Sequence, residues 1–340
     1  MHMSDALLSP VIGGTFWAAS AAIIGLATRK ISSEADGSKT VLMGVLGAFV
    51  FAAQMINFTI PGTGSSGHLG GGLLLAVLLG PWRAFITLAS VLVIQALFFA
   101  DGGLLALGCN IFNLAFFPAF VAWPFIYRPI AGDARSGARL AAGSITAATA
   151  GLLLGAMSVV MQTSLSGISD LPFRTFTLFM MPLHLCIGIV EGLVTWAVLS
   201  FVAKTEPTLL AGGKTLSKPG FILPAFVVAT MTIGGVLSWF ASSRPDGLEW
   251  SITRASGKEA LVVPDDKIHS FLASVQKRAA LLPDYGFRER KEAAPANTVP
   301  PSPVDPGTSI SGIAGSLMVM LLAGSAGLLL RRRAPETPDA

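Results

Sequence analysis

Long apolar runs separated by short polar turns dominate the pattern of this sequence. Most of the runs approach or exceed the roughly 20 residues that an α-helix needs to cross a bilayer. The pattern predicts an all-α integral membrane protein with about nine transmembrane helices, seven followed by two. The runs fall at 11–28, 41–60, 69–82, 84–100, 103–127, 140–165, 176–203, 220–241 and 310–330.

The third run, 69–82, is short for a membrane span. About 14 residues of helix cover roughly 21 Å of a hydrocarbon core that is about 30 Å thick. Irregular backbone at such a depth is tolerated only where protein or a cavity surrounds it. The preceding residues 61–68, with the sequence PGTGSSGH, are therefore expected to dip into a protein-lined pocket.

Residues 242–308 form a polar segment between the last two runs and divide the chain into domains. We predict a membrane domain over 1–205, a cytoplasmic linker over 206–219, and a second domain over 220–340. The second domain has helices at 220–241 and 310–330 that flank a small extracytoplasmic module and precede a cytoplasmic tail. An apolar stripe at helical spacing predicts a helix in the module; its members are Ile268, Phe271, Leu272, Val275, Ala279 and Leu282.

The distribution of basic residues predicts the orientation. If the first turn, with Arg29, Lys30 and Lys39, is cytoplasmic, thirteen Lys and Arg residues lie on the cytoplasmic side and only Arg174 lies in a short outer loop. The long 242–308 segment is not subject to this charge rule. We therefore expect residue 1 outside and residue 340 in the cytoplasm of a bacterial inner (plasma) membrane.

Composition supports a membrane protein and excludes other classes. The chain of 340 residues is 52% hydrophobic and 12% charged, whereas soluble proteins are about 25% charged. Its net charge of +4 comes from Lys and Arg residues in the loops. We therefore expect contact with membrane lipid and no nucleic-acid partner. Cys109 and Cys186 both lie in apolar runs, which excludes a disulfide framework or a CxxC zinc motif.

Two nucleotide-binding patterns are present but lack their context. Gly62, Gly64 and Gly67 form a GxGxxG without a surrounding βαβ unit. Residues 211–215, AGGKT, resemble a phosphate loop, but Thr208 occupies the position of the first glycine. The chain therefore carries no recognisable ATPase of its own.

A few polar residues lie inside the predicted spans. Glu191 is the only charged residue deep within one, and His184 lies two turns away on the same helix face. The two could bond each other and fix helix packing, or take part directly in ligand binding. Asn110 must also find a partner in the bundle. The sequences GLLLG (151–155) and GIVEG (188–192) predict close helix contacts.

The histidines suggest a metal site at the start of the chain. The Met1 amine, the His2 amide nitrogen and the His2 Nδ1 atom can close two adjacent chelate rings around one metal, and the His68 imidazole can add a fourth nitrogen. Four in-plane nitrogens suit Ni(II) or Cu(II) better than tetrahedral zinc. The alternative is that a histidine at position 2 has no role. His269, in the predicted module helix, is expected to lie outside the site.

Four segments, in order, resemble the substrate-specific M components of energy-coupling-factor nickel and cobalt transporters. The segment around residues 244–250, RPDGLEW, with its flanking spans, resembles the N subunit of such systems, here fused to the M component. The four segments are MHMSDALLS (1–9), GSSGHLGGGLLLAVLLGPW (64–82), QALFFADGGLLALGCNIFN (95–113) and HLCIGIVEG (184–192).

The resemblance implies a transporter component and not an enzyme. It implies high-affinity capture of nickel or cobalt by Met1, His2 and His68, without a cofactor other than the transported ion. Separate ATPase subunits and a membrane coupling subunit would drive uptake. Ser4 and Ala6 replace the Pro and Gly that are more usual in the family, without changing the chelating atoms. Candidates for supporting the ligands or lining the metal path are Asp5, Asn110, His184 and Glu191.

Two rival functions use different residues. A self-sufficient secondary metal permease would need coupling carboxylates across its spans, where Glu191 is alone. An intramembrane enzyme would use His184, Glu191 and Cys186, but Cys186 lies off the His184 face. The segment around 244–250 favours nickel over cobalt by analogy only.

Overall fold

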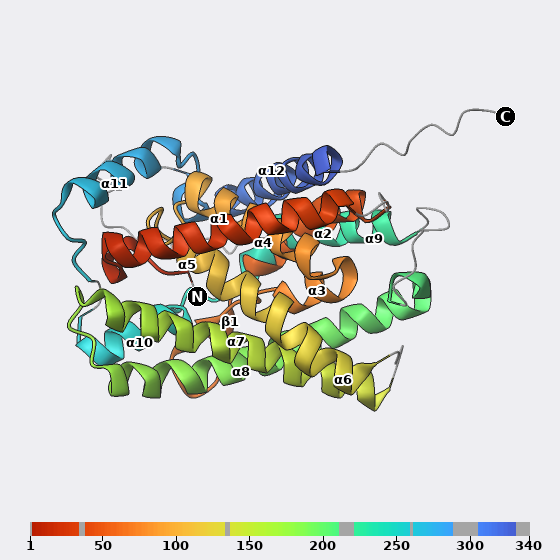
Figure 1. Ribbon diagram of the computed structural model, residues 1–340, viewed down its shortest axis with the longest axis horizontal. Helices are drawn as coiled ribbons and strands as arrows, with labels where there is room; N and C mark the ends of the chain where they lie inside the picture. The colour runs from red at the N-terminus through yellow and green to blue at the C-terminus, as the bar shows by residue number, and fades with distance from the viewer. Residues whose placement is uncertain are drawn as a thin grey trace.

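The computed structural model describes residues 2–33, 38–132, 137–210, 221–258, 261–287 and 305–330 (Figure 1). A two-stranded hairpin, β1 (Phe58–Ile60) and β2 (Ser65–Gly67), interrupts an otherwise helical chain. The helices are α1 (Pro10–Ser33), α2 (Ser38–Gln54), α3 (Gly72–Leu79), α4 (Pro81–Phe98), α5 (Leu107–Ile111), the π-helical η2 (Phe112–Tyr127), α6 (Arg128–Ala131), α7 (Ala138–Ser166), α8 (Phe173–Thr205), α9 (Ile222–Gly235), α10 (Gly247–Ser256), α11 (Lys267–Ala279) and α12 (Pro306–Leu330), with short 3-10 turns η1 (Asp5–Leu7), η3 (Pro207–Leu209), η4 (Leu237–Phe240) and η5 (Pro283–Tyr285).

Each predicted apolar run contains helix, which confirms the all-α membrane class. Six of the described helical segments are long and apolar enough to cross a membrane. The apolar part of α2 and helix α9 are shorter, and α3 has only 8 residues. The predicted number of nine spans is therefore not confirmed. Helix α3 is short because Gly71 and Gly80, which bound it, both have positive φ values.

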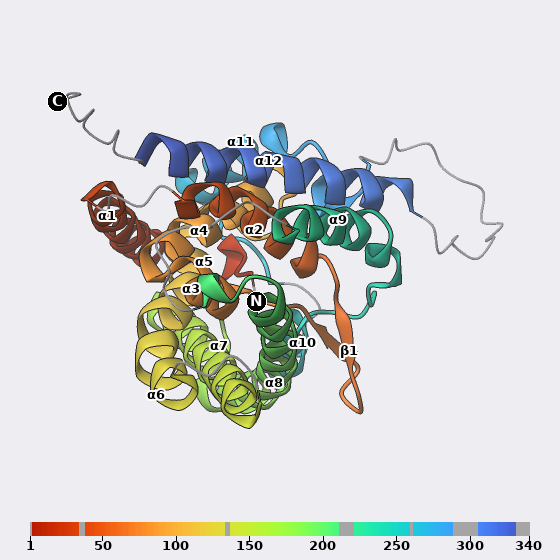
Figure 2. The same cartoon turned by 90° about the vertical axis from the view of Figure 1, so that its right-hand side faces the viewer.

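The helices form layers that are visible in two perpendicular views. Helices α7 and α8 lie side by side at the bottom of Figures 1 and 2, while α12 lies at the top, with α9 directly below it in Figure 2. Helices α3, α4 and α5 lie between them, so they are enclosed from both sides. The N-terminus lies near the centre of both views, inside the helical assembly.

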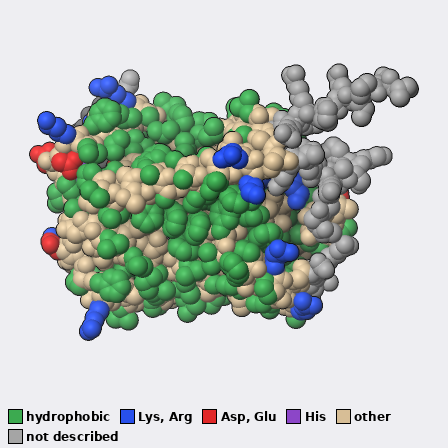
Figure 3. Space-filling model, in the orientation of Figure 1, with side chains coloured by type: hydrophobic (Ala, Val, Ile, Leu, Met, Phe, Trp, Pro, Cys, Tyr) green, Lys and Arg blue, Asp and Glu red, His purple; other side chains and the backbone are tan. Residues whose placement is uncertain are grey.

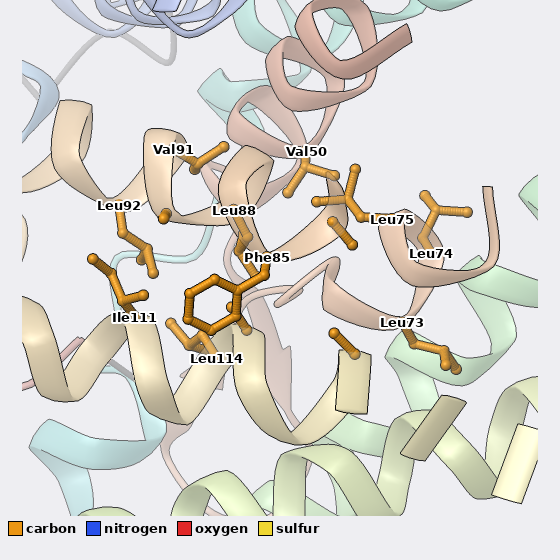
Figure 4. Close-up of a cluster of buried hydrophobic side chains, with 14 of the residues drawn as sticks. Val50, Leu73, Leu74, Leu75, Phe85, Leu88, Val91, Leu92, Ile111 and Leu114 are labelled. Atoms are coloured by element: carbon orange, nitrogen blue, oxygen red, sulfur yellow. The ribbon is translucent and has the colours of Figure 1, made fainter. Parts of the chain in front are cut away.

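Buried apolar side chains join the layers. Leu73 and Leu75 of α3, Phe85 and Leu88 of α4 and Leu114 of η2 are all buried. Phe85, Leu88 and Leu114 lie close together in Figure 4, and Leu75 and Leu73 of α3 lie to their right. Apolar side chains also cover the middle of the face in Figure 3, whereas Lys and Arg lie mostly towards its two ends. This distribution matches a hydrocarbon slab between two polar surfaces.

Small residues allow close contact between helices, as the sequence predicts. A Cβ added to Gly188 would lie 2.6 Å from Thr149 Cα, and one added to Gly192 would collide with Ile145 Cα. These two glycines belong to α8 and meet α7. In the second domain, Gly312 of α12 meets the backbone of Gly234 in α9 in the same way.

Only the second half of residues 61–68 is enclosed by protein: Ser65, Ser66 and Gly67 are buried, whereas Pro61, Gly62 and Gly64 are exposed. The segment includes the end of a β-hairpin that the sequence analysis does not predict. Thr59 pairs with Ser66, and the turn between the strands contains Gly62 and Gly64, both with positive φ. Ser65 and Ser66 are fully buried. The hairpin forms because the ladder satisfies backbone groups that could not otherwise find partners at this depth.

The second domain contributes two capped helices at the same end of the molecule as the hairpin. Asp246 caps α10 by accepting hydrogen bonds from the N–H groups of Leu248 and Glu249. The predicted helix over the apolar stripe is present as α11, but Phe271 of that stripe is 63% exposed, whereas His269 is 1% exposed. Helix α11 therefore packs through a mixed face, in which buried His269 lies on the same helix as Leu272 and Val275, which are partly buried against the core.

Replacing Gly192 with Ala is expected to lower stability. The added methyl group would collide with the α7 backbone at Ile145, and overpacking of this kind typically costs about 1–3 kcal/mol. The measurement is the thermal unfolding midpoint of the protein in detergent. Gly14→Ala in α1 is the matched control, because its methyl group meets nothing within 4 Å. An unchanged midpoint for Gly192→Ala would contradict the proposed close contact.

Candidate metal centre

The N-terminal segment is fixed by backbone hydrogen bonds to the loop and helix around residues 101–110. The N–H of Met3 donates to Asn110 Oδ1 at 2.8 Å, and Asn110 Nδ2 donates to the Met3 carbonyl at 3.2 Å. The N–H of Gly103 donates to the same carbonyl at 2.9 Å. One asparagine in α5 thus pairs with both backbone groups of Met3, which places His2 close to α5.

Asp5 holds the next part of this segment. Its Oδ1 accepts a hydrogen bond from the N–H of Ala106 at 3.0 Å. The carboxylate is largely buried, and burial raises its pKa above the usual range although hydrogen bonds from the backbone oppose the shift. Asp5 therefore fixes the backbone at the turn η1, three residues after the proposed ligand His2.

His2 and His68 lie together, as the chelate hypothesis requires. Their rings are stacked, with centroids 5.0 Å apart and planes within 2° of parallel. The His2 side chain is 7% exposed, and its Nδ1 lies 3.1 Å from Asp101 Oδ1. Its Nε2 has no hydrogen-bond partner within the described ranges. Met1, the remaining candidate ligand, lies outside the described residues.

Asp101 links His2 to the second domain. The Tyr285 hydroxyl donates to Asp101 Oδ2 at 2.5 Å. Burial alone would raise the pKa of Asp101, but the charge and hydrogen bond of His2, together with the hydrogen bond from Tyr285, lower it well below the usual range. The ionised Asp101 carboxylate can act as the counter-charge for a cation bound beside it.

His68 follows β2, and Glu191 of α8 fixes the backbone just beyond it. Glu191 accepts hydrogen bonds from the N–H of Gly70 at 2.8 Å and of Gly71 at 3.1 Å. The Nδ1 of His68 lies 3.1 Å from the Leu69 carbonyl. Burial lowers the pKa of His68 to about 3, and His2 acts in the same direction. His68 is therefore neutral at physiological pH and needs no proton loss to bind a metal.

His184 and Glu191 do not bond each other. The Nδ1 of His184 lies 2.8 Å from the Met180 carbonyl, one turn earlier in α8. The two residues share a helix face, as the sequence predicts, but Glu191 bonds the glycine backbone after His68. The alternative that His184 and Glu191 bond each other is therefore wrong. The Glu191 carboxylate instead accepts hydrogen bonds from the N–H groups of Gly70 and Gly71.

The segment RPDGLEW contacts the hairpin directly. The N–H of Ser66 donates to the Pro245 carbonyl at 2.8 Å, and its hydroxyl donates to the Arg244 carbonyl at 2.8 Å. These bonds bring Asp246 to the site, where its Oδ2 lies 4.0 Å from His68 Nε2. The extracytoplasmic module of the sequence analysis thus contributes an acidic side chain to the neighbourhood of His68.

Two more contacts join α11 to the metal-bearing segments. His269 Nε2 lies 3.2 Å from the Asp5 carbonyl and 3.0 Å from the Leu8 carbonyl. Gln276 Nε2 donates to the carbonyls of Ala96 and Gly102. His269 lines the same large cavity as His2, and its hydrogen bonds hold the N-terminal segment that carries His2.

Two cavities meet at this site. A large one, about 950 Å³, is lined by His2, Asp5, Asp101 and residues of the second domain. A small one, about 10 Å³, lies beside His184. Within the described ranges, no three side chains of His, Cys, Asp or Glu are grouped closely enough to hold a metal ion as they stand. A site here must therefore include backbone nitrogens or form when side chains move.

Sequence reasoning missed three residues at this site. Asp101 is visible in the sequence as an acid at the end of an apolar run, but nothing there pairs it with His2. Asp246 lies in a recognisable segment whose contact with His68 depends on the fold. Tyr285 gave no signal, since it follows the predicted module helix without a motif of its own.

Comparisons with known proteins identify relatives of both parts of the chain. Residues 2–209 match the family model CbiM, described as a cobalt uptake substrate-specific transmembrane region, and residues 220–332 match the PDGLE domain. A proposed fused nickel transport protein, NikMN, of Archaeoglobus fulgidus is 31% identical over 95% of this chain and 96% of its own length. The cobalt transport protein CbiM of Sorangium cellulosum is 31% identical over 62% of this chain and 94% of its own.

Solved structures share the fold of the first part. The crystal structure of a truncated transition metal transporter matches with a TM-score of 0.52 and 31% sequence identity, covering 60% of this chain and 99% of that one. A second transition metal transporter matches with a TM-score of 0.53 over 62% of this chain and 97% of its own.

Replacing Glu191 with Ala is expected to weaken nickel binding on the order of 10–100-fold, the range typical of residues that orient a ligand. The reason is that the N–H groups of Gly70 and Gly71 lose their acceptor, which frees the backbone next to His68. Isothermal titration with Ni²⁺ measures the change. Glu206→Ala, at the far end of α8, is the control, and equal affinities for the two variants would contradict this role.

Proposed function

The chain belongs to the CbiM family of cobalt-uptake substrate-specific transmembrane regions, and we propose that it captures nickel, or cobalt, through Met1, His2 and His68. Its relatives are named for nickel or cobalt transport, and membrane metal uptake is the function of this group. The observation that carries the ligand assignment is the stacking of His2 on His68 at an anchored N-terminus.

The proposed ligands are four nitrogens. The Met1 amine, the His2 amide nitrogen and His2 Nδ1 form two fused chelate rings, and the His68 imidazole completes the plane. Hydrogen bonds from Asn110 and Gly103 to Met3 support this arrangement, because they fix the backbone directly after the chelate. An anchored segment loses less conformational entropy when it binds a metal, and the affinity is higher as a result.

Metal capture requires an exchange at His2. Its Nδ1 faces Asp101 Oδ1 at 3.1 Å, yet the same nitrogen is needed for the chelate. A divalent ion that enters can replace the proton shared by this pair, since the ion also neutralises the carboxylate. Asp101 thus orients the His2 ring before the metal binds, and it remains nearby as a counter-charge afterwards.

Nickel is the first candidate substrate. Planar coordination by four nitrogens suits Ni(II) and Cu(II) and is unusual for zinc, and relatives of this chain are named for nickel transport. Relatives named for cobalt transport share the family, so cobalt is the second candidate substrate. A nickel-loaded protein should accordingly be yellow-orange and diamagnetic.

We further propose that ATP hydrolysis on separate subunits, together with a membrane coupling subunit, drives uptake. A self-sufficient permease would need a membrane carboxylate free to carry a coupling ion. Glu191, the one acid deep within a span, instead holds the backbone at Gly70 and Gly71. This engagement favours a substrate-binding component over a permease. The proposed orientation has residue 1 outside and residue 340 in the cytoplasm.

An extension added before Met1 is expected to abolish tight nickel binding. It converts the free amine into an amide and removes one corner of the chelate. Titration of purified protein with Ni²⁺ measures the effect, and the same extension after Ala340 is the control that should leave binding intact. Tight, planar nickel binding by the N-terminally extended protein would overturn the chelate.

Purified protein alone in liposomes is expected to show no metal accumulation. Accumulation of ⁶³Ni²⁺ should require co-reconstitution with the ATPase and coupling subunits and the addition of ATP, because the chain holds no ATPase motif. A proton or sodium gradient is the comparison condition. Gradient-driven accumulation without partner subunits would support the permease instead.

A further inference from the structure

We propose a second metal position, in the small pocket where the second domain meets the first, with His68, His184 and Asp246 as its ligands. This inference rests on the proposed function, because the ion would reach the pocket from the chelate at His2 and His68. It assigns a role to His184, and it makes the second domain part of the metal path.

The pocket has the size and lining of a single-ion site. Its volume of about 10 Å³ is close to what one water molecule requires. Apolar side chains of Leu114, Leu152 and Ile187 form part of its wall, and the polar side chains are His68, His184 and Asp246. An ion here would be largely stripped of water, so that protein ligands must replace its hydration shell.

Both histidines are oriented as metal ligands usually are. A carbonyl can only accept a hydrogen bond, so His184 must carry its proton on Nδ1 to bond the Met180 carbonyl at 2.8 Å. The same reasoning applies to His68, whose Nδ1 lies 3.1 Å from the Leu69 carbonyl. In each ring the other nitrogen, Nε2, then carries a lone pair. A backbone carbonyl that fixes the tautomer in this way is typical of metal-binding histidines.

Asp246 provides an oxygen whose distance from His68 Nε2 would allow one ion to bind both atoms. Two atoms that each lie about 2.1 Å from one metal can be at most about 4.2 Å apart, and Asp246 Oδ2 lies 4.0 Å from His68 Nε2. The other carboxylate oxygen, Oδ1, caps α10. The cap and the bond from Ser66 to Pro245 together hold Oδ2 towards His68.

His184 lines the same pocket next to Gly247. A Cβ added to Gly247, the residue after Asp246, would lie 3.3 Å from His184 Cε1 and 3.8 Å from its Nε2. Glycine at this position therefore keeps the space in front of the imidazole open. A modest movement of the three side chains would bring them around one ion.

The ligand chemistry differs from that of the planar chelate. Two imidazoles and one carboxylate leave coordination positions open and form no fused chelate ring, so the pocket should bind Ni²⁺ or Co²⁺ more weakly than the four nitrogens do. His68 belongs to both sets. An ion could thus move from one set to the other by exchanging the N-terminal nitrogens for His184 and Asp246, while His68 stays bound.

The cavities define a sequence of positions. His68 and Asp246 line both the large cavity and the small pocket, whereas His2 lines only the large one and His184 only the small one. An ion that leaves the chelate in the direction of α8 therefore passes His68 and Asp246 first. The proposed weaker site, in the small pocket, is therefore next to the tighter chelate on the side of α8.

The test uses the full chain with the chelate removed, by an N-terminal extension combined with His2→Ala, and Co²⁺ alone as the probe. We expect one Co²⁺ per chain with the visible spectrum of five- or six-coordinate cobalt. Adding His184→Ala or Asp246→Asn should each weaken this binding at least about 10-fold, the lower end of the effect of supporting residues alone. His184→Gln serves if the alanine variant does not fold.

Asp246→Asn is informative because asparagine caps helices as well as aspartate does, so α10 should persist. Asp305→Asn, which alters another helix-start aspartate that lines the large cavity but not the small pocket, is the matched control. Loss of all Co²⁺ binding in the chelate-free chain, or binding that survives both pocket replacements, would overturn the second position. Failure of the unmodified chain to bind Ni²⁺ tightly would instead overturn the proposed function.

Discussion

Burying a chain terminus obliges a protein to supply a partner for every backbone N–H and C=O that water would otherwise bond. Here Asn110 serves both groups of Met3, and His269 serves the carbonyls of Asp5 and Leu8. The Asp5 side chain in turn accepts the N–H of Ala106. The position of His2 depends on this set of bonds. Because they address backbone atoms, they fix the path of the segment independently of its side chains, and Ser4 and Ala6 can replace more rigid residues.

The same constraint explains how irregular backbone persists between the hairpin and α3. Gly70 and Gly71 cannot take part in a helix or a strand, and both are buried or nearly so. Glu191 satisfies both N–H groups with one carboxylate. A charged group inside a helical bundle is usually read as a site for an ion, yet here its charge is used to hold peptide groups that carry His68. Glu191 therefore supports the candidate metal site by fixing the backbone that follows His68.

The sequence predicts what depends on composition and spacing, and fails where long-range backbone contacts decide. The apolar runs locate the helices, and the GIVEG pattern identifies the close approach of Gly192 to α7. The pairing of His2 with His68 follows from chelate chemistry. The hairpin, the bond between Tyr285 and Asp101 and the docking of Pro245 on Ser66 could not be predicted, since each joins segments far apart in the chain through geometry that no local pattern records.

The contact between Ser66 and residues 244–246 is small: one main-chain hydrogen bond, the bonds of the Ser66 hydroxyl and one parallel bridge. Two separate chains would make such a contact only briefly at ordinary concentrations. Covalent fusion turns docking into an intramolecular event, with an effective concentration that reaches the millimolar range for short connections. The link between the domains, together with the packing of α12 and α9 on α2, therefore raises the fraction of time that the Asp246 carboxylate spends beside His68. A version of this protein split into two subunits would have to maintain that occupancy through such packing, without the link.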